Sequence, residues 1–345
     1  MSLVKAAIHA FEDTPMPDVV SRAAIHFLVG DARRRLSGAP NDASAAFAQT
    51  MGVHPIATHT DAANAQHYEL PAAFFEVVLG PNLKYSSGLY PAGARTLAEG
   101  ETAALRATEL HADLQDGQTV LELGCGWGSL SLWMAERFPG SKITSVSNSA
   151  SQRAFIEGRA AARGLGNLTV ITADMNDFST DQRFDRVVSV EMFEHMSNWR
   201  ALLTRVNGWL KPDGLLFIHV FTLKNAPYRF DVNDPADWIA QYFFTGGVMP
   251  SHDLPRQFGD LFTVEQDWRW SGAHYARTAE QWLENFDANR ATIDPVLEQV
   301  YGRDAAVWRR RWRLFFLATS GLFGHRGGQE WGVSHYRMRP VGQEA

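Results

Sequence analysis

Two carboxylates and an imidazole lie close together in the segment E-M-F-E-H at residues 191–195. If this segment forms one helical turn, Glu191 and His195 are four residues apart and share a face, with Glu194 beside them. Crowded carboxylates raise one another's pKa, and a nearby carboxylate raises the pKa of an imidazole. The cluster therefore predicts a general base that works near neutral pH, with a solvated polar turn as the alternative. His219, at the end of a later apolar run, is expected in the same crevice or in the core.

A glycine-rich segment, V-L-E-L-G-C-G-W-G-S at 120–129, separates an apolar run from an amphipathic stretch. Glycines at alternate positions, among them Gly124 and Gly126, allow a positive φ and a close approach of a ligand to the backbone. A helix that begins after this loop would direct its free N–H groups towards that ligand. We interpret the segment as a nucleotide-type cofactor loop rather than a plain turn. Glu122 either accepts a hydrogen bond from a ligand ammonium group or rigidifies the loop.

Polar residues also follow the next two apolar runs. Asn148 and Gln152 come four residues apart, at a place where dinucleotide enzymes usually carry an acid for the ribose hydroxyls. Side-chain amides can also hydrogen-bond ribose hydroxyls, so a ribose-binding site is still expected here. The missing acid argues against an ordinary NAD enzyme. Further on, Asp174 can accept a hydrogen bond from an adenine amine and Met175 can contact its ring, unless Asp174 caps a turn.

The segment K-Y-S-S-G at 84–88 is too short and too rich in serine and glycine to predict a regular element. The hydroxyls of Tyr85 and Ser86 either complete a turn or donate hydrogen bonds to a ligand carboxylate. The histidines are scattered and Cys125 is the single cysteine, so we predict no metal site.

Short apolar runs alternate with amphipathic stretches from residue 119, which predicts right-handed βαβ units on a parallel sheet. Ligands bind such sheets outside the carboxyl ends of the strands, where the residues discussed above lie. Two later runs predict an antiparallel edge pair around a helix at 278–300, with Thr278 as its N-cap, and a helix at 304–322. The predicted strands are 119–123, 142–146, 168–172, 184–190, 215–220, 262–270 and 331–338.

The composition excludes several classes of protein. The chain has 345 residues, 45% of them hydrophobic, and a net charge of −6, so it is typical of a globular protein that does not bind nucleic acid. No run approaches the roughly 20 apolar residues of a membrane span, and no secretory signal is evident. We therefore expect a cytoplasmic protein without stable membrane insertion. A homodimer is compatible with the sequence, although no residue pattern decides it.

Taken together, the motifs resemble those of class I S-adenosylmethionine-dependent methyltransferases of the cyclopropane-fatty-acid synthase group. The segments 84–88, 120–129, 147–152 and V-S-V-E-M-F-E-H-M at 188–196 carry this likeness. The chain is more similar still to coclaurine-type N-methyltransferases in segments that include Q-H-Y-E-L-P at 66–71, Y-F-F-T-G-G-V-M-P-S at 242–251, H-Y-A-R-T at 274–278 and L-F-G-H-R-G-G-Q-E-W at 322–331.

The resemblance implies an α/β fold with a Rossmann-like, seven-stranded methyltransferase sheet. It implies an N-terminal helical cap at 1–90 and a cofactor-binding core at 91–345, with helical lid insertions at 221–260 and 278–325. It also implies a set of contacts to S-adenosylmethionine, which runs from the methionine part through the ribose to the adenine. We add Glu122 to this set because it lies at the end of a predicted strand. The expected cofactor-binding residues are then Tyr85, Ser86, Glu122, Gly124, Gly126, Asn148, Gln152, Asp174 and Met175.

The acidic cluster matches the one that binds and deprotonates the substrate amine in the N-methyltransferases. We expect His195 to take the proton, assisted by Glu191 and oriented by Glu194, before in-line methyl transfer to a small aromatic or heterocyclic amine. The residues expected to contact this substrate are Trp238, Phe244 and Tyr275.

Cyclopropane synthases instead hold bicarbonate as the base, with a set of residues that Glu194, His219 and Tyr275 match. Methyl or methylene transfer to an unsaturated fatty acyl chain is therefore the alternative function. Ser87 stands where those enzymes have cysteine, and Glu191 stands where they typically have glycine. Both departures favour an amine substrate. A protein that only binds the cofactor is a third hypothesis, which the intact acidic cluster disfavours.

Overall fold

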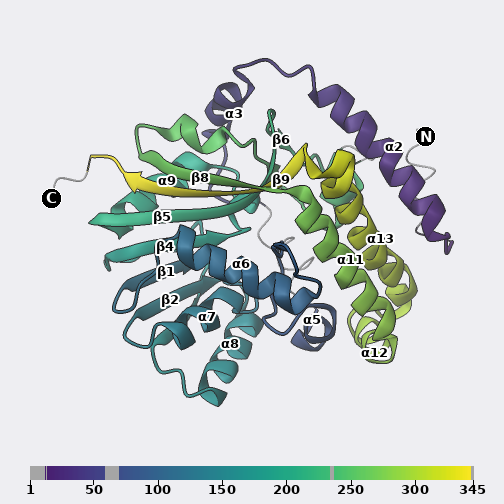
Figure 1. Ribbon diagram of the computed structural model, residues 1–345, viewed down its shortest axis with the longest axis horizontal. Helices are drawn as coiled ribbons and strands as arrows, with labels where there is room; N and C mark the ends of the chain where they lie inside the picture. Colours follow the sequence, from purple (N-terminus) through teal and green to yellow (C-terminus); the bar gives the residue numbers. More distant parts are fainter. Residues whose placement is uncertain (1–11, 13, 59–69, 234–236, 343–345) are drawn as a thin grey trace.

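A seven-stranded sheet organises the computed structural model, which describes residues 12, 14–58, 70–233 and 237–342 (Figure 1). The strand order is β3-β2-β1-β4-β5-β9-β8. The strands are β1 Thr119–Leu123, β2 Lys142–Ser147, β3 Leu168–Thr172, β4 Phe184–Val190, β5 Leu210–Leu223, β8 Phe262–Ser271 and β9 Trp331–Pro340. The seven-stranded α/β class expected from the sequence is confirmed. β5 extends beyond the expected run at both ends.

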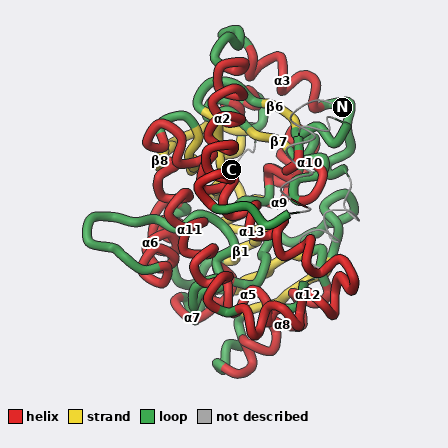
Figure 2. Tube along the Cα trace, turned by 90° about the vertical axis from the view of Figure 1, so that its right-hand side faces the viewer, coloured by secondary structure: helices red, strands yellow, loops and turns green. Residues whose placement is uncertain are grey.

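Helices cover both faces of the parallel part of the sheet, which explains why most residues of its central strands β1 and β4 are buried. Val187 of β4 packs into a cluster with Leu202 of α9 (Trp199–Trp209). Its neighbour Val188 faces the opposite side and packs with Leu105 and Met134. The helices on that side are α6 (Leu97–His111) and α7 (Ser129–Arg137), while α8 (Ala150–Ala162) packs against β3. Figure 2 shows strands enclosed by helices.

The antiparallel end of the sheet is built from β9 and β8. β9 pairs antiparallel with β5, so that His219 lies opposite His335, and β8 pairs antiparallel with β9. The expected antiparallel pair is therefore present, but of its two strands β8 alone lies at an edge of the sheet, because β9 lies between β5 and β8.

The helices between β8 and β9 differ from the prediction, because the first begins six residues earlier and the predicted helix at 278–300 is divided between two helices. In chain order, the helices of this region are α11 (Gly272–Ala288), α12 (Arg290–Tyr301) and α13 (Ala305–Gly324). The prediction that Thr278 is an N-cap is wrong: Ser271 caps α11, and its hydroxyl accepts from the amide of Ala273 at 3.2 Å. Thr278 lies inside the helix, where its hydroxyl donates to the carbonyl of His274.

Three helices of the predicted N-terminal cap lie against distant parts of the chain (Figure 1). α2 (Asp18–Leu36) packs on α13, α3 (Ala43–Met51) on α9, and α5 (Ala72–Val78) on α11 and α12. Residues 1–11, 13 and 59–69 of the cap, with most of the motif at 66–71, lie outside the described residues.

The segment after β5 has little regular structure, and its residues Phe244 and Thr245 line the pocket described below. It contains β6 (Tyr228–Arg229), α10 (Trp238–Tyr242), β7 (Val248–Met249) and the 3₁₀ helix η2 (Leu254–Phe258). The ring of Phe243 stacks on Phe315 of α13 with centroids 4.4 Å apart, which fixes this segment to the late helices. No helix in the described ranges is both long and apolar enough to span a membrane.

Candidate active site

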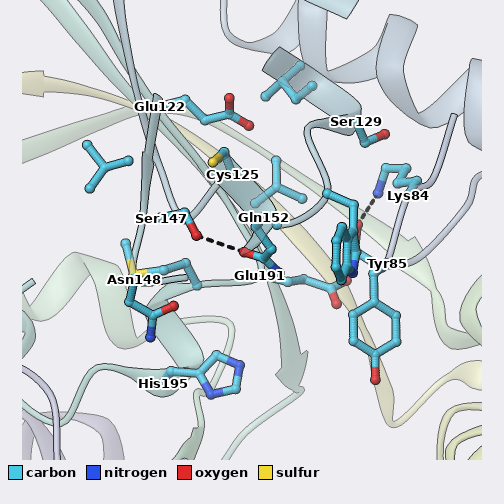
Figure 3. A pocket seen from close by; sticks show the side chains of 18 of the residues that line it. Lys84, Tyr85, Glu122, Cys125, Ser129, Ser147, Asn148, Gln152, Glu191 and His195 are labelled. Carbon is cyan, nitrogen blue, oxygen red and sulfur yellow. Dashed lines mark hydrogen bonds between the residues drawn. The ribbon is translucent and has the colours of Figure 1, made fainter. Parts of the chain in front are cut away.

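A pocket lies at the carboxyl ends of β1, β2 and β4, where the strand–helix alternation predicts a ligand site. Figure 3 shows that its lining side chains come from segments far apart in sequence. Within the described ranges, no group of three or more His, Cys, Asp or Glu residues is placed to hold a metal ion. The predicted site residues that line the pocket are Tyr85, Ser86, Glu122, Gly124, Gly126, Asn148, Gln152, Asp174, Met175, Glu191, His195, Phe244 and Tyr275.

The glycine loop after β1 forms one wall of the pocket. Gly124, Gly126 and Gly128 have φ values of 79°, 49° and 82°, a region that favours glycine. A Cβ on Gly124 would lie 2.5 Å from the side chain of Met192, whereas a Cβ on Gly126 would meet open space. The loop is therefore packed behind Gly124 and accessible to a ligand at Gly126.

Glu122 is buried beneath the loop, with its side chain 3% exposed. Its Oε2 accepts hydrogen bonds from the hydroxyls of Ser131 and Ser145. Burial raises the pKa of Glu122 to about 7. These contacts support the loop-rigidifying interpretation, and a contact to a ligand ammonium group stays a prediction.

Several buried polar groups of the pocket lining have no hydrogen-bond partner among the described residues, and two of them belong to Gln152 and Ser129. Gln152 accepts a hydrogen bond from the Ser147 hydroxyl at 2.7 Å through Oε1, but its Nε2 finds no partner among the described residues. The hydroxyl of Ser129, at the start of α7, is also buried and has no hydrogen-bond partner in the described part of the chain. A buried donor left unpaired costs about 1–3 kcal/mol, so a bound ligand that accepts these hydrogen bonds would be favoured. The hydroxyls and carboxylate of S-adenosylmethionine fit these donors.

Asp174 and Met175 line the pocket beyond β3, as expected for an adenine site. Oδ1 of Asp174 also accepts from the amide of Asn176 at 2.7 Å, so this residue caps the following turn as well. The turn holds the carboxylate in place, and an adenine contact stays a prediction.

Lys84 is a pocket residue that sequence reasoning missed. Its Nζ donates to the Ser86 hydroxyl at 2.5 Å and to the carbonyl of Ser87 at 2.8 Å. Burial lowers the pKa of Lys84 to about 8, and the charges of Glu191 and Glu101 oppose this effect. A lysine at the start of K-Y-S-S-G was a usable signal, because buried carboxylates require a nearby positive charge.

Glu191 is the centre of the polar network in the pocket. It ends β4 in a left-handed conformation with φ 48°, and its amide donates to the carbonyl of His219 at 2.8 Å. Its Oε1 accepts from the amide of Ser87 at 3.0 Å and lies 3.1 Å from Nε2 of His219. Its Oε2 accepts from the Tyr275 hydroxyl at 2.7 Å. Burial raises the pKa of Glu191, and the charge of Lys84 and these hydrogen bonds oppose the rise.

The expected helical turn at 191–195 does not form as predicted. The 3₁₀ helix η1 spans only Phe193–His195, because the left-handed Glu191 breaks the backbone before it. His195 lines the pocket, and its ring stacks on Phe244 with centroids 4.7 Å apart. Glu194 instead points into the interior, where its Oε1 accepts from the amide of Phe221 at 2.7 Å. Burial and the nearby Glu191 raise the pKa of Glu194 well above its ordinary value.

The three predicted substrate residues are not all in the pocket. Phe244 and Tyr275 line it, but Trp238 does not. The indole of Trp238 is buried against Phe243 and donates to Oε1 of Glu12 at 3.0 Å. The short helix α10 turns this ring towards the aromatic core, so its position does not support a substrate contact. His219 also lies behind the pocket lining and reaches it through Glu191.

Comparisons with known proteins agree with this geometry. Residues 57–327 match the family described as mycolic acid cyclopropane synthetase. The (S)-coclaurine N-methyltransferase of Thalictrum flavum subsp. glaucum is 37% identical over 285 residues, which cover 81% of this chain and 79% of that protein. The cyclopropane-fatty-acyl-phospholipid synthase of Escherichia coli (strain K12) is 31% identical over 270 residues, which cover 78% and 66%.

Solved structures show the same relationship. A crystal structure of coclaurine N-methyltransferase bound to N-methylheliamine and SAH has a TM-score of 0.91 at 32% identity, and the match covers 98% of this chain and 100% of that one. A cyclopropane synthase of Mycobacterium tuberculosis has a TM-score of 0.69 at 23% identity, covers 82% and 98%, and shares the fold. The chain therefore belongs to the mycolic acid cyclopropane synthetase family and is an S-adenosylmethionine-dependent methyltransferase.

Proposed function

We propose that the protein transfers a methyl group from S-adenosylmethionine to the nitrogen of a small aromatic or heterocyclic amine. The observation that carries the proposal is that the Glu191 carboxylate lines the same pocket as the stacked rings of His195 and Phe244. A carboxylate attracts an ammonium group, and aromatic rings pack on a flat organic body or on its charge. The similarity to (S)-coclaurine N-methyltransferases supports nitrogen as the methyl acceptor.

Within this proposal Glu191, rather than His195, takes the proton from the amine. Hydrogen bonds from Ser87 and Tyr275 favour the ionised form of Glu191, whereas burial makes it more basic than an exposed carboxylate. The stacked ring of His195 orients the substrate beside this carboxylate. Glu194, whose pKa is raised by burial and by the nearby Glu191, anchors the start of the lid segment by accepting a hydrogen bond from the amide of Phe221.

The cofactor would lie against the glycine loop. When bound, S-adenosylmethionine supplies an electrophilic sulfonium methyl group. Gly126 would allow close approach, and Ser129 and Gln152 would donate hydrogen bonds from their buried polar groups. Phe244 of the lid segment and Tyr275 of α11 would exclude water from the reacting nitrogen.

The alternative function, transfer to an unsaturated fatty acyl chain, is weakened by the position of Glu191. Tyr275 and His219 both contact the Glu191 carboxylate. The resemblance to cyclopropane synthases assigns bicarbonate to these same residues. In this chain a built-in carboxylate therefore takes the place of the bicarbonate.

Radiolabelled S-adenosylmethionine, offered with a panel of secondary and tertiary amines and separately with vesicles of unsaturated phospholipid, tests the proposal. We expect label in an amine and no dependence on bicarbonate. Glu191→Gln keeps the size of the side chain but removes the base, and should lower kcat by about 10²–10⁴-fold. Label in phospholipid and in no amine would overturn the proposal.

A further inference from the structure

Three histidines from three different elements form a line behind Glu191. Nδ1 of His219 on β5 lies 2.8 Å from Nε2 of His335 on β9. Nδ1 of His335 is the remaining ring nitrogen of that residue, and it lies 2.8 Å from Nδ1 of His111, the last residue of α6. The cross-strand pairing of His219 with His335 in the sheet sets the first of these contacts. The line continues the contact between Glu191 and Nε2 of His219, so four groups are joined from the pocket outwards.

The line runs from the interior towards the surface. His219 and His335 are fully buried, and Trp270 and Phe217 pack against the ring of His335. His111 is only partly buried, and its ring stacks on Trp268 with centroids 3.8 Å apart and an interplanar angle of 3°. The helix α6 that carries His111 lies across the face of the sheet and contacts β9 (Figure 1). His219 and His335, at the inner end of the line, are therefore shielded from solvent, whereas His111, at the outer end, is accessible to it.

All three rings are neutral near neutral pH. Burial lowers the pKa of His219 and His335 well below the ordinary value, and the charge of Lys84 adds to this. Burial and the charge of Arg337 on β9 lower the pKa of His111 to about 4. A neutral imidazole has one N–H donor and one acceptor nitrogen. Each contact in the line can thus hold one proton, and a chain of such bonds can pass a proton along by exchanging donors and acceptors.

Glu191 has few other ways to lose a proton once the pocket is filled, because its side chain is only 8% exposed. Among the described residues, its carboxylate contacts the amide of Ser87, the hydroxyl of Tyr275 and the imidazole of His219. An amide does not take up a proton, and the pKa of Tyr275 is raised well above its ordinary value by burial and by Glu191, so its hydroxyl stays protonated. Of these three groups, the imidazole is the one that can accept a proton and release another.

We propose that His219, His335 and His111 form a relay that carries the substrate proton from Glu191 to solvent at the end of α6. The proposal rests on the proposed function, in which Glu191 receives that proton. The carboxyl proton of Glu191 passes to Nε2 of His219, and the Nδ1 proton of His219 passes to Nε2 of His335. The Nδ1 proton of His335 then passes to Nδ1 of His111, whose Nε2 proton goes to water. One proton enters and one leaves, and each ring is left with its N–H on its other nitrogen. Rotation of the three rings then restores the starting state before the next transfer.

The first test measures proton release and methyl transfer together in single-turnover reactions with a pH indicator. We expect the wild type to release one proton for each methyl group transferred, without a lag. His111→Ala should slow release and turnover by about tenfold or more in weak buffer. Added imidazole should restore both rates, because a soluble base can replace the outer member of the relay. Affinity for S-adenosylhomocysteine should stay unchanged, and His26→Ala, which removes an exposed histidine of α2, is the matched control.

The second test needs no methyl transfer. NMR of protein labelled with ¹⁵N-histidine follows exchange of the ring N–H protons of His219 and His335 with solvent. His111→Phe keeps a ring on Trp268 but closes the outlet, so both exchange rates should fall. His335→Gln keeps hydrogen-bonding groups but cannot exchange tautomers, and should slow exchange at His219.

The outcomes separate the two proposals. Exchange that slows in these variants supports the relay even if no amine is methylated, in which case only the proposed function fails. Unchanged exchange, or a lag in His111→Ala that imidazole does not shorten, overturns the relay while leaving amine methylation in place.

Discussion

The hydrogen bond from Tyr275 to Glu191 gives a quantitative test of the proposed base. The hydroxyl lies 2.7 Å from Oε2 of the carboxylate and lowers the pKa of Glu191. A hydrogen bond to a charged group contributes about 1.5–3 kcal/mol, and one pKa unit corresponds to about 1.4 kcal/mol. Tyr275→Phe should therefore raise the pKa of Glu191 by about one to two units.

This shift has a defined sign in the pH profile. Glu191 accepts the substrate proton only when it is ionised, so a higher pKa leaves less active enzyme at low pH. The acid limb of kcat/KM for amine methylation should move about one to two pH units upwards in Tyr275→Phe. The aromatic ring is retained and still stacks on Phe323, whose centroid is 4.3 Å from that of Tyr275, so the fold should not change.

Tyr90→Phe is the matched control. It removes a hydroxyl that donates at the same distance, 2.7 Å, to Oε1 of Gln281, which is not part of the pocket lining. Its acid limb should coincide with that of the wild type. If the limb of Tyr275→Phe also stays in place while the rate falls at every pH, Glu191 is not the group that titrates, and the proposed base is refuted.

Three further variants test other parts of the structure. The pKa of Glu122 in the folded state is raised from 4.5 to about 7, so the wild type should lose stability as the pH rises through this window. Glu122→Gln should therefore be more stable than the wild type at pH 8, by up to about 3 kcal/mol in the free energy of unfolding. An equal difference at pH 5 would contradict this. Gln152→Met removes a buried donor from the cofactor side and should weaken binding of S-adenosylhomocysteine about two- to tenfold by calorimetry; unchanged affinity would remove Gln152 from the cofactor site. Trp238→Phe breaks the bond to Glu12 and should lower Tm without changing KM for the amine, whereas a higher KM would restore its substrate role.

Much of the fold follows from local patterns. The strands at 119–123, 168–172 and 184–190 end where the structure ends β1, β3 and β4, because a glycine or an acidic residue stands within two positions after each of them. Helix starts depend more on tertiary structure. Thr278 is a good N-cap residue by type, yet Ser271 supplies the cap, because the chain leaves β8 there and begins α11 at once.

The candidate site was predictable as a list of residues but not as a network. Most of the residues that the strand-end rule and the family likeness pointed to line the pocket, including Tyr85, Gln152 and Glu191. The rule and the likeness did not show that the backbone of Glu191 is left-handed. This conformation keeps Glu191 out of the helical turn that contains His195 and turns its side chain towards Tyr275. They also did not single out Lys84, whose significance comes from the buried carboxylates that fold around it.

The sequence by itself determined the alternation of strands and helices, the cofactor loop and the family, because these depend on side-chain periodicity and on conformations available to a few adjacent residues. Only the tertiary structure decided which groups share protons. Tyr275 meets Glu191 across 84 positions, His335 meets His219 across 116, and His111 meets His335 across 224. Those contacts depend on the register of β5 against β9 and on the packing of α6 and α11 around the sheet, which no local pattern encodes.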